Sequence, residues 1–428
     1  MKISGGFTFK PFSKKQRQVL NWWLSPVAER DGIIADGAIR SGKTLCMSLS
    51  FVMWAMECFE EQNFAMCGKT IGSFRRNVLA VLKLTLAARG YKCVEHRSDN
   101  LVEITRGEVT NYFYIFGGKD ERSQDLIQGI TLAGVFFDEV ALMPQSFVNQ
   151  ATARCSVDGS KFWFNCNPES PYHWFKTDWI DTRKSKDLLY LHFTMDDNLS
   201  LSAKIKNRYK AQYSGVFYER YILGRWAMAQ GVIYDMFDKQ KHVVKFDDIK
   251  DKLNGAIYVS CDYGTQNATV FKKWQKASDN CWYCIDEYYY SGREQQKQKT
   301  DAEYTDDMLE FIGDDKPRAV VVDPSAASFI EALRRKGLPV IKAKNDVLDG
   351  IREMAKRLTT NEIKYCDNCV RTFEEFSAYS WDEKAQARGE DVPVKEHDHC
   401  LDADRYFVYT ILTRGKARIS NKRQRGFN

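Results

Sequence analysis

A glycine-rich segment near the N-terminus carries the residue types that bind phosphate. Residues 37–44 read GAIRSGKT, which matches the pattern Gly-x-x-x-x-Gly-Lys-Ser/Thr between a strand-like run and a helix-like run. In such a loop, backbone N–H groups and the helix N-terminus hold the phosphates, Lys43 reaches the β- and γ-phosphate oxygens, and Thr44 binds Mg²⁺. The motif predicts a nucleoside triphosphate site formed by Gly37, Arg40, Ser41, Gly42, Lys43 and Thr44.

An acidic pair completes the chemistry that this loop needs. Asp138 and Glu139 directly follow the apolar run 133–137. A carboxylate at Asp138 holds Mg²⁺ through its water shell, because this ion dehydrates reluctantly. Glu139 is placed to orient or deprotonate the attacking water. The pair therefore predicts that the nucleotide, ATP with Mg²⁺, is hydrolysed.

Three further residues near the predicted site are open to two interpretations. Arg40 either stabilises γ-phosphate charge in the transition state or forms a surface salt bridge. Gln16 either contacts the adenine edge or completes a helix-capping box with Ser13. Asn167 follows the strand-like run 161–165 and is a candidate sensor that couples loss of the γ-phosphate to motion.

A second group of chemically active residues lies in the other half of the chain. Two apolar runs end in Asp262 and Asp323, while His399 and Asp402 share one face of a predicted helix. If the two strands are neighbours in one sheet, both aspartates emerge at the same edge. Converging carboxylates suit two hard cations, Mg²⁺ or Mn²⁺, about 3.5–4 Å apart, that cleave phosphodiesters. Strand-end aspartates also occur in purely structural roles.

The elements that must position the first group alternate along the first half of the chain. Alternating strands and helices predict an α/β domain with a parallel sheet, flanking helices, and a site at the carboxyl ends of its strands. We expect strands at 32–36, 63–67, 133–137 and 161–165, a hairpin of 101–103 with 112–116, and helices at 44–60 and 71–89.

A different pattern begins after a glycine-containing boundary at 218–238. We expect an ATPase domain at 1–228, a linker at 229–244, and a second α/β domain with a mixed sheet and a basic tail at 245–428. The second domain's expected strands are 256–262, 269–275, 281–290 and 318–323, and its expected helices are 302–313, 325–337, 347–358 and 400–414.

Composition limits the class of protein. The 428 residues suffice for two or three domains, and 63 basic against 57 acidic side chains give a net charge of +6. The basic excess of the C-terminal tail either contacts nucleic acid or is simply solvated. The twelve cysteines without a secretory signal predict reduced thiols and a cytoplasmic protein. The longest apolar run, 45–59, is too short to span a bilayer, so no membrane partner is expected.

Two Cys-x-x-Cys pairs are either a zinc site or buried thiols. Cys281 with Cys284 and Cys366 with Cys369 could together supply four thiolates. The pairs are farther apart than in a compact zinc ribbon, and the first pair lies in a strand-like run that points i and i+3 to opposite faces. Buried thiols are the favoured interpretation.

These motifs together resemble the large subunit of tailed-phage and prophage DNA-packaging terminases, of the type that joins an ATPase half to a ribonuclease H-like nuclease half. One departure is the loop arginine, since Arg40 directly precedes Ser41 instead of lying nearer the first glycine. The resemblance covers most of the chain and is carried by GAIRSGKT, VFFDEVALMP, NCNPESPYHWFK, RYILGRW with GVIYDMF, VSCDYGT, VVVDPSAASFI and DHCLDADRY.

The resemblance implies ATP-driven translocation of double-stranded DNA into a procapsid and metal-dependent endonucleolytic cleavage of concatemeric DNA. It implies a small terminase subunit, a portal protein and a homo-oligomeric ring as partners, and the host-cell cytoplasm, not the mature virion, as location. By family motif, Lys43, Thr44, Asp138 and Glu139 form the ATPase set, Asn167 lies in the coupling motif, and Asp262, Asp323 and Asp402 are nuclease metal ligands with His399 beside them.

Two other classes of function remain as alternatives. A DNA helicase or repair ATPase with an attached nuclease would carry a second motor domain, whereas residues 245–428 contain no second ATPase-like pattern. A binding module with a degenerate nuclease half would dock on a capsid vertex without cutting DNA. The intact acids Asp262, Asp323 and Asp402 argue against this alternative.

Overall fold

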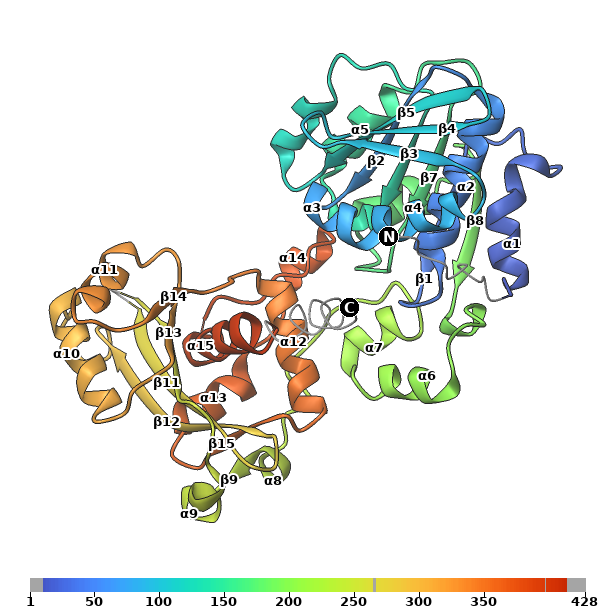
Figure 1. Ribbon diagram of the computed structural model, residues 1–428. Coiled ribbons are helices and arrows are strands. Elements are labelled where there is room, and N and C mark those ends of the chain that lie inside the picture. The colour runs from blue at the N-terminus through green and yellow to red at the C-terminus, as the bar shows by residue number, and fades with distance from the viewer. Residues whose placement is uncertain (1–10, 265–266, 397, 414–428) are drawn as a thin grey trace, which may run out of the picture. The chain divides into compact units, whose positions relative to one another are not determined.

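Each half of the chain is organised by one β-sheet (Figure 1). The computed structural model describes residues 11–264, 267–396 and 398–413, so the basic tail, residues 414–428, lies outside the described residues. The first unit comprises the described residues up to Lys210 together with Val216–Met228 and Ala387–Glu390. The second unit comprises Ala211–Gly215, Ala229–Gln386 and the described residues from Asp391.

The first unit contains an eight-stranded sheet in the order β3-β4-β5-β2-β6-β7-β1-β8. The pairs from β5 to β8 are parallel, whereas β3, β4 and β5 form an antiparallel meander. The parallel pairing brings the carboxyl ends of β1, β6 and β7 to one edge. The strands are β1 (Gly32–Gly37), β2 (Asn63–Gly68), β3 (Lys92–His96), β4 (Leu101–Arg106), β5 (Val109–Gly117), β6 (Gly134–Asp138), β7 (Lys161–Asn165) and β8 (Leu188–Phe193).

The helices flank this sheet, as expected for an α/β domain. The α-helices are α1 (Lys14–Asn21), α2 (Lys43–Cys58), α3 (Ile71–Phe74), α4 (Ala80–Ala87), α5 (Gln145–Ala153), α6 (Ala203–Lys210) and α7 (Gly215–Tyr221). Short helical turns are η1 (Trp22–Leu24), η2 (Arg75–Leu79), η3 (Glu121–Ile127), η4 (Val140–Leu142), η5 (Lys176–Ile180) and η6 (Met195–Asp197).

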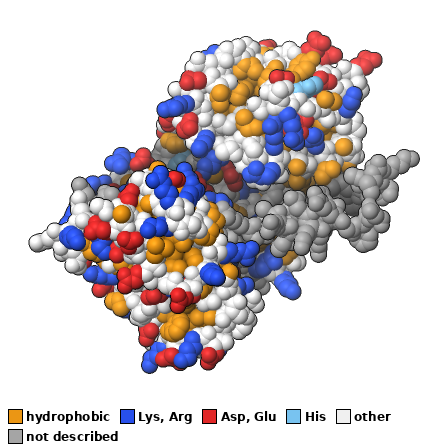
Figure 2. Space-filling model, turned by 60° about the vertical axis from the view of Figure 1, so that its left-hand side comes forward, with side chains coloured by type: hydrophobic (Ala, Val, Ile, Leu, Met, Phe, Trp, Pro, Cys, Tyr) orange, Lys and Arg blue, Asp and Glu red, His pale blue; other side chains and the backbone are white. Residues whose placement is uncertain are grey.

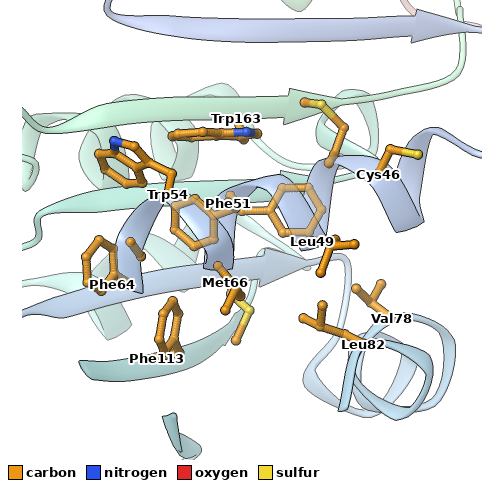
Figure 3. Packing of buried hydrophobic residues seen from close by; sticks show 14 of the residues in the cluster. Cys46, Leu49, Phe51, Trp54, Phe64, Met66, Val78, Leu82, Phe113 and Trp163 are labelled. Carbon is orange, nitrogen blue, oxygen red and sulfur yellow. The ribbon is translucent and has the colours of Figure 1, made fainter. Parts of the chain in front are cut away.

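Aromatic packing fixes α2 against the sheet and thereby fixes the loop that precedes the helix (Figure 3). Phe51 is fully buried, and its ring centroid lies 5.2 Å from that of Trp163 on β7 and 5.8 Å from that of Phe64 on β2. Trp54, one turn further along α2, lies 4.7 Å from Trp163. Such contacts stabilise beyond simple burial because edge-to-face and offset geometries favour the ring quadrupoles.

The first unit differs from expectation in two places. The helix expected at 71–89 is divided, because residues Arg75–Leu79 form a π-helical turn between α3 and α4. Strands β3 and β8 were not expected. β8 is an edge strand whose four central residues are only partly buried, so its sequence LLYLHF does not follow a simple buried-strand pattern.

The second unit contains a seven-stranded mixed sheet in the order β14-β13-β10-β11-β12-β15-β9. β10, β11 and β12 are antiparallel neighbours, whereas β13 is parallel to β10 and β14 is parallel to β13. The strands are β9 (Val243–Val244), β10 (Tyr258–Asp262), β11 (Ala268–Lys276), β12 (Trp282–Ser291), β13 (Ala319–Val322), β14 (Val340–Lys342) and β15 (Ile363–Cys366).

One helix from the end of the described chain, α15 (His399–Phe407), contacts β10, β11 and β13. It continues as the π-helical turn η8 (Val408–Leu412). The other helices of this half are α8 (Lys239–His242), α9 (Phe246–Ile249), η7 (Lys250–Lys252), α10 (Asp301–Ile312), α11 (Ala327–Arg335), α12 (Val347–Thr359), α13 (Val370–Ala378) and α14 (Glu383–Ala387).

The segment expected to be a linker, 229–244, packs into the second unit. Tyr234 is 2% exposed, and its ring lies 5.6 Å from Phe376 of α13. Ile233 N–H donates to the Tyr379 carbonyl at 2.9 Å, and β9 pairs with β15. Apolar side chains within this segment explain the difference, since their burial ties the segment to a core.

The surface carries both signs of charge. On the face in Figure 2, Lys and Arg side chains are interspersed with Asp and Glu side chains on each unit. Among the residues that the structure describes, no helix has the length and apolar character needed to cross a membrane.

Candidate nucleotide and nuclease sites

The phosphate loop adopts a backbone that glycine makes possible. Gly37 has φ +122° and Gly42 has φ +87°, both in a region that L side chains rarely adopt. A Cβ at Gly37 would lie 2.0 Å from the Phe193 carbonyl oxygen of β8. Arg40 also has a positive φ, +57°, and Asn198 Nδ2 donates to its carbonyl oxygen at 2.7 Å. The loop therefore contacts both the end of β8, at Phe193, and the segment after β8, at Asn198.

Lys43 is buried at the base of the loop, with 5% of its surface exposed. Its Nζ donates to the carbonyl oxygens of Gly37 at 2.9 Å and Ala38 at 2.8 Å, and to Asn167 Oδ1 at 3.2 Å. Burial lowers the pKa of Lys43 to about 8, against the opposing charge of Asp138 and Glu139. An ammonium group held in this way suits an anionic ligand that would compensate its desolvation.

The first residue pair of the expected Mg²⁺ site is in direct contact. Thr44 Oγ1 on α2 donates to Asp138 Oδ1 at the end of β6 at 3.0 Å. Burial raises the pKa of Asp138 to about 7, and the charge of Glu139 adds to this rise. A carboxylate destabilised by burial and by a like charge is favoured by a nearby cation, so the oxygen ligands at this position fit Mg²⁺.

The other predicted residues of this site lie around the loop. Gln16 Oε1 accepts from Ser13 N–H at 3.0 Å, which confirms the capping box, and Gln16 Nε2 donates to the Ser41 carbonyl at 3.1 Å. The Arg40 guanidinium lies 5.4 Å from the ring centroid of Tyr209 on α6. Glu139 is exposed and has φ +59°, an uncommon conformation for a non-glycine residue.

Sequence reasoning missed Asn165, the last residue of β7. Its Nδ2 donates to Thr44 Oγ1 at 2.9 Å and to Asp138 Oδ1 at 2.5 Å. Asn165 is 2% exposed, and within the described residues its Oδ1 has no hydrogen-bond partner. The only local signal was a polar residue at the end of an apolar strand. Its role follows from the parallel pairing of β6 with β7, which places Asn165 opposite Asp138.

Asp36 at the end of β1 was also missed. Its fully buried carboxylate binds His192 Nδ1 at 3.0 Å and accepts from Trp226 Nε1 at 2.7 Å. The Ile39 N–H of the loop donates to the Tyr221 carbonyl at 2.9 Å. The segment that ends the first unit is therefore joined to the back of the phosphate loop.

In the second unit, the two strand-end aspartates lie on neighbouring parallel strands. Cys261 of β10 is paired with Val322 of β13, so Asp262 and Asp323 follow at the same edge. Burial raises the pKa of Asp262 to about 6. Burial acts in the same direction on Asp323, but hydrogen bonds from Ser325 and the Tyr406 hydroxyl outweigh it and lower the pKa of that carboxyl.

Helix α15 brings the remaining candidates to this edge. His399 Nδ1 lies 2.9 Å from Asp262 Oδ2. Asp402 Oδ1 accepts from Arg405 Nε at 3.1 Å and forms an ion pair with Arg405 Nη2, which lies 2.9 Å away. The negative charge of Asp402 contributes, after burial and the opposing bond from His399, to the raised pKa of Asp262. The predicted residues thus share one electrostatic environment.

The chemistry of these side chains fits divalent cations, although they are not drawn together into one ligand shell. Within residues 11–264, 267–396 and 398–413, no group of three or more His, Cys, Asp or Glu side chains is close enough to hold a metal ion. Asp262, Asp323 and Asp402 each contact a protein donor, as metal-binding carboxylates commonly do. Oxygen donors with mutual repulsion favour Mg²⁺ or Mn²⁺.

The cysteine pairs are buried. Burial raises the pKa of Cys281 to about 11 and that of Cys366 to about 12. Cys284 Sγ and Cys369 Sγ lie 3.8 Å apart. All twelve cysteines are free thiols. All four side chains are buried, which agrees with the interpretation of the pairs as buried thiols.

The fold and its two sites define a phosphate-loop ATPase unit joined to a unit with a ribonuclease H-like mixed sheet. Residues 34–241 match the family model "Terminase large subunit, T4likevirus-type, N-terminal", and residues 274–410 match "Terminase RNaseH-like domain". The chain belongs to the family of terminase large subunits, which makes it an ATPase and nuclease of phage DNA packaging.

Solved structures support the same assignment. The large terminase from a thermophilic bacteriophage is 62% identical, covers 94% of this chain and 100% of its own, and superposes with a TM-score of 0.90. Structures of that terminase with ADP and with ATP-gamma-S are 62% and 61% identical over the same shares of both chains, with TM-scores of 0.89 and 0.88. No curated protein sequence matches the chain.

Asn165→Ala tests whether the missed asparagine supports the Mg²⁺ site. The substitution removes both bonds to Thr44 and Asp138, so we expect the Mg²⁺ requirement of ATP hydrolysis to rise about 10- to 100-fold, as for other groups that orient metal ligands. The measurement is ATP turnover against Mg²⁺ concentration, with the exposed Asn149→Ala as control. An unchanged Mg²⁺ dependence would rule out this role.

Proposed function

We propose that ATP is bound and hydrolysed at the residues 37–44 loop, with Mg²⁺ held by Thr44 and Asp138. The observation that carries this proposal is the contact of Thr44 Oγ1 with Asp138 Oδ1, beside the buried ammonium of Lys43. Bound Mg²⁺ supplies charge neutralisation on the phosphate oxygens. Lys43 binds the β- and γ-phosphates, while Gly37, Ser41 and Gly42 provide the backbone of the loop.

Glu139 is the proposed general base for the attacking water. It is exposed at the end of β6, next to Asp138, and its backbone adopts φ +59°. Strained conformations of this kind concentrate at functional sites, where the surrounding structure enforces them. The strain supports a role in which the side chain must point in one direction from the strand end.

Three residues are proposed to sense or steer the nucleotide. Asn167 contacts Lys43 at 3.2 Å and is placed to report on the γ-phosphate. Gln16 contacts the loop carbonyl of Ser41 and is a candidate for contact with the adenine edge. Arg40 is a candidate arginine finger, and its position over the Tyr209 ring keeps the guanidinium beside the loop.

DNA cleavage is proposed to occur at the edge formed by β10, β13 and α15. Asp262, Asp323 and Asp402 would hold two ions, Mg²⁺ or Mn²⁺, with His399 at Asp262 as a further candidate ligand. Two such ions supply activation of water and stabilisation of the leaving oxygen. Tyr406 and Arg405 hold the carboxylates of Asp323 and Asp402 in place.

The proposed work of the whole chain is translocation of double-stranded DNA into a procapsid, followed by cutting of concatemers. This rests on the family assignment together with the two sites. We propose a small terminase subunit and the portal protein as partners, and a homo-oligomeric ring as the packaging form. The host-cell cytoplasm is the proposed location, and the mature virion is not expected to contain the protein.

Lys43→Ala tests the nucleotide site. Removing the ammonium that faces the phosphates should reduce ATP turnover by at least about 10²–10³-fold, as measured by phosphate release. Circular dichroism and DNA cleavage should stay at wild-type levels, as they should for the exposed Lys14→Ala. Turnover retained in Lys43→Ala would contradict the assignment of the loop.

Glu139→Gln separates binding from hydrolysis. The amide keeps the size of the side chain but cannot accept the proton of water, so turnover should fall about 10²–10⁴-fold. ATP affinity, followed by calorimetry, should change little because Thr44 and Asp138 remain. Normal turnover would remove Glu139 from the role of base.

Asp262→Ala tests the nuclease site. Loss of the strand-end carboxylate should reduce plasmid cleavage to background with either Mg²⁺ or Mn²⁺ while sparing ATP hydrolysis. Asp306→Ala, whose side chain is 74% exposed in the same unit, should cleave normally. Simultaneous loss of both activities in a folded Asp262→Ala chain would argue against two separate sites.

A further inference from the structure

Helix α15 carries His399 and Asp402 in its first turn, and a buried carboxylate from another helix holds that turn. The first N–H groups of a helix have no partner within it and need an external acceptor. Glu375 Oε2, on α13, accepts from Cys400 N–H at 2.8 Å and from Leu401 N–H at 3.1 Å. Glu375 is 5% exposed.

The local sequence does not provide this cap. Asp398 occupies the N-cap position of α15 but its side chain makes no capping hydrogen bond. Asp and Asn side chains at that position commonly cap their own helix. Here the acceptor comes from Glu375, so α13 helps to fix the first turn of α15.

The same arrangement holds α13 itself. Cys369 at its N-cap position makes no side-chain cap. Glu287 of β12 accepts instead, with Oε1 from Arg371 N–H at 2.9 Å and Oε2 from Thr372 N–H at 3.1 Å. The fully buried Lys272 of β11 donates to Glu287 Oε2 at 2.8 Å. Two carboxylates thus link the central strands to α13, and α13 to α15.

We propose that Glu375 is a positioning residue of the nuclease site, whose carboxylate oxygen sets the first turn of α15 so that His399 and Asp402 face Asp262 for divalent cations. This rests on the proposed nuclease function. His399 directly precedes Cys400, whose N–H group Glu375 caps. The Nδ1 atom of His399 lies 2.9 Å from Asp262 Oδ2. A shift of this turn therefore moves both candidate ligands relative to the strand end.

Three substitutions of Glu375 test separately the hydrogen-bond acceptor, the length and the charge of its side chain. Glu375→Ala removes the acceptor, and Glu375→Asp keeps the charge but is one methylene shorter. Glu375→Gln keeps both length and one acceptor oxygen. Because a single oxygen accepts both bonds, the amide oxygen of Gln should replace the carboxyl oxygen well.

The adjacent Glu374 offers a matched control. Its side chain is 59% exposed and pairs with Arg371 at 3.1 Å on the surface of the same helix. Such an exposed ion pair contributes little to the stability of the protein. Glu374→Ala should therefore leave metal binding and cleavage unchanged.

The experiment measures Mn²⁺ binding to the full chain without nucleotide, by the loss of the free-ion EPR signal, and DNA cleavage against Mn²⁺ concentration. Asp262→Ala identifies the ions that belong to the nuclease site. Glu375→Ala and Glu375→Asp should weaken Mn²⁺ binding about tenfold and raise the Mn²⁺ needed for half-maximal cleavage, with a smaller change in kcat. Glu375→Gln should restore most of the affinity.

Two results would overturn the proposal. One is unchanged Mn²⁺ affinity in folded Glu375→Ala and Glu375→Asp chains. Even if their Tm were lower, this result would mean that Glu375 only stabilises the helix and does not position the metal ligands. The other is a Glu375→Gln chain as weak as Glu375→Asp. If Glu375→Ala does not fold, the comparison of Asp with Gln at this position decides. Unaltered Mn²⁺ binding in Asp262→Ala would instead contradict the proposed nuclease site.

Discussion

Both sites depend on the parallel pairing of neighbouring strands, which makes the strands end at the same edge of a sheet. In the first unit this pairing places Asp138 beside Asn165, next to the loop that follows β1. In the second unit it places Asp262 beside the strand that leads to Asp323. The backbone hydrogen bonds of the parallel strands fix which residues lie opposite each other, so the backbone already aligns these polar groups. In the first unit, Asn165 and Asp138 then also bond through their side chains.

The parts of these sites that can be predicted from the sequence are those that depend on a pattern of neighbouring residues. The loop at 37–44 and the acids Asp138, Asp262 and Asp323 each follow an apolar run, and this local pattern indicates both the strand and its end. Asn165 has the same local signature, but its role depends on β6 being its neighbour. Glu375 acts on residues 25 and 26 positions later, and this relationship has no local pattern.

The elements that were not predicted from the sequence were missed for related reasons. β8 supports the phosphate loop through its Phe193 carbonyl, yet its partly buried residues resemble neither a buried strand nor an alternating one. Residues 229–244 mix charged and apolar side chains, and the burial of Ile233, Tyr234 and His242 shows that they belong to a core. In each case the tertiary partner, and not the segment's own composition, decides the structure.

The placement of α15 also sets an order in time. Chains are synthesised from the N-terminus at about 5–20 residues per second, and early domains fold first. β10 leaves the ribosome long before α15. Asp262 at the end of β10 is therefore synthesised well before His399 and Asp402, which α15 carries. A product interrupted before His399 can retain the phosphate loop while lacking Asp402. The proposed nuclease site is therefore complete only after α15 has been synthesised.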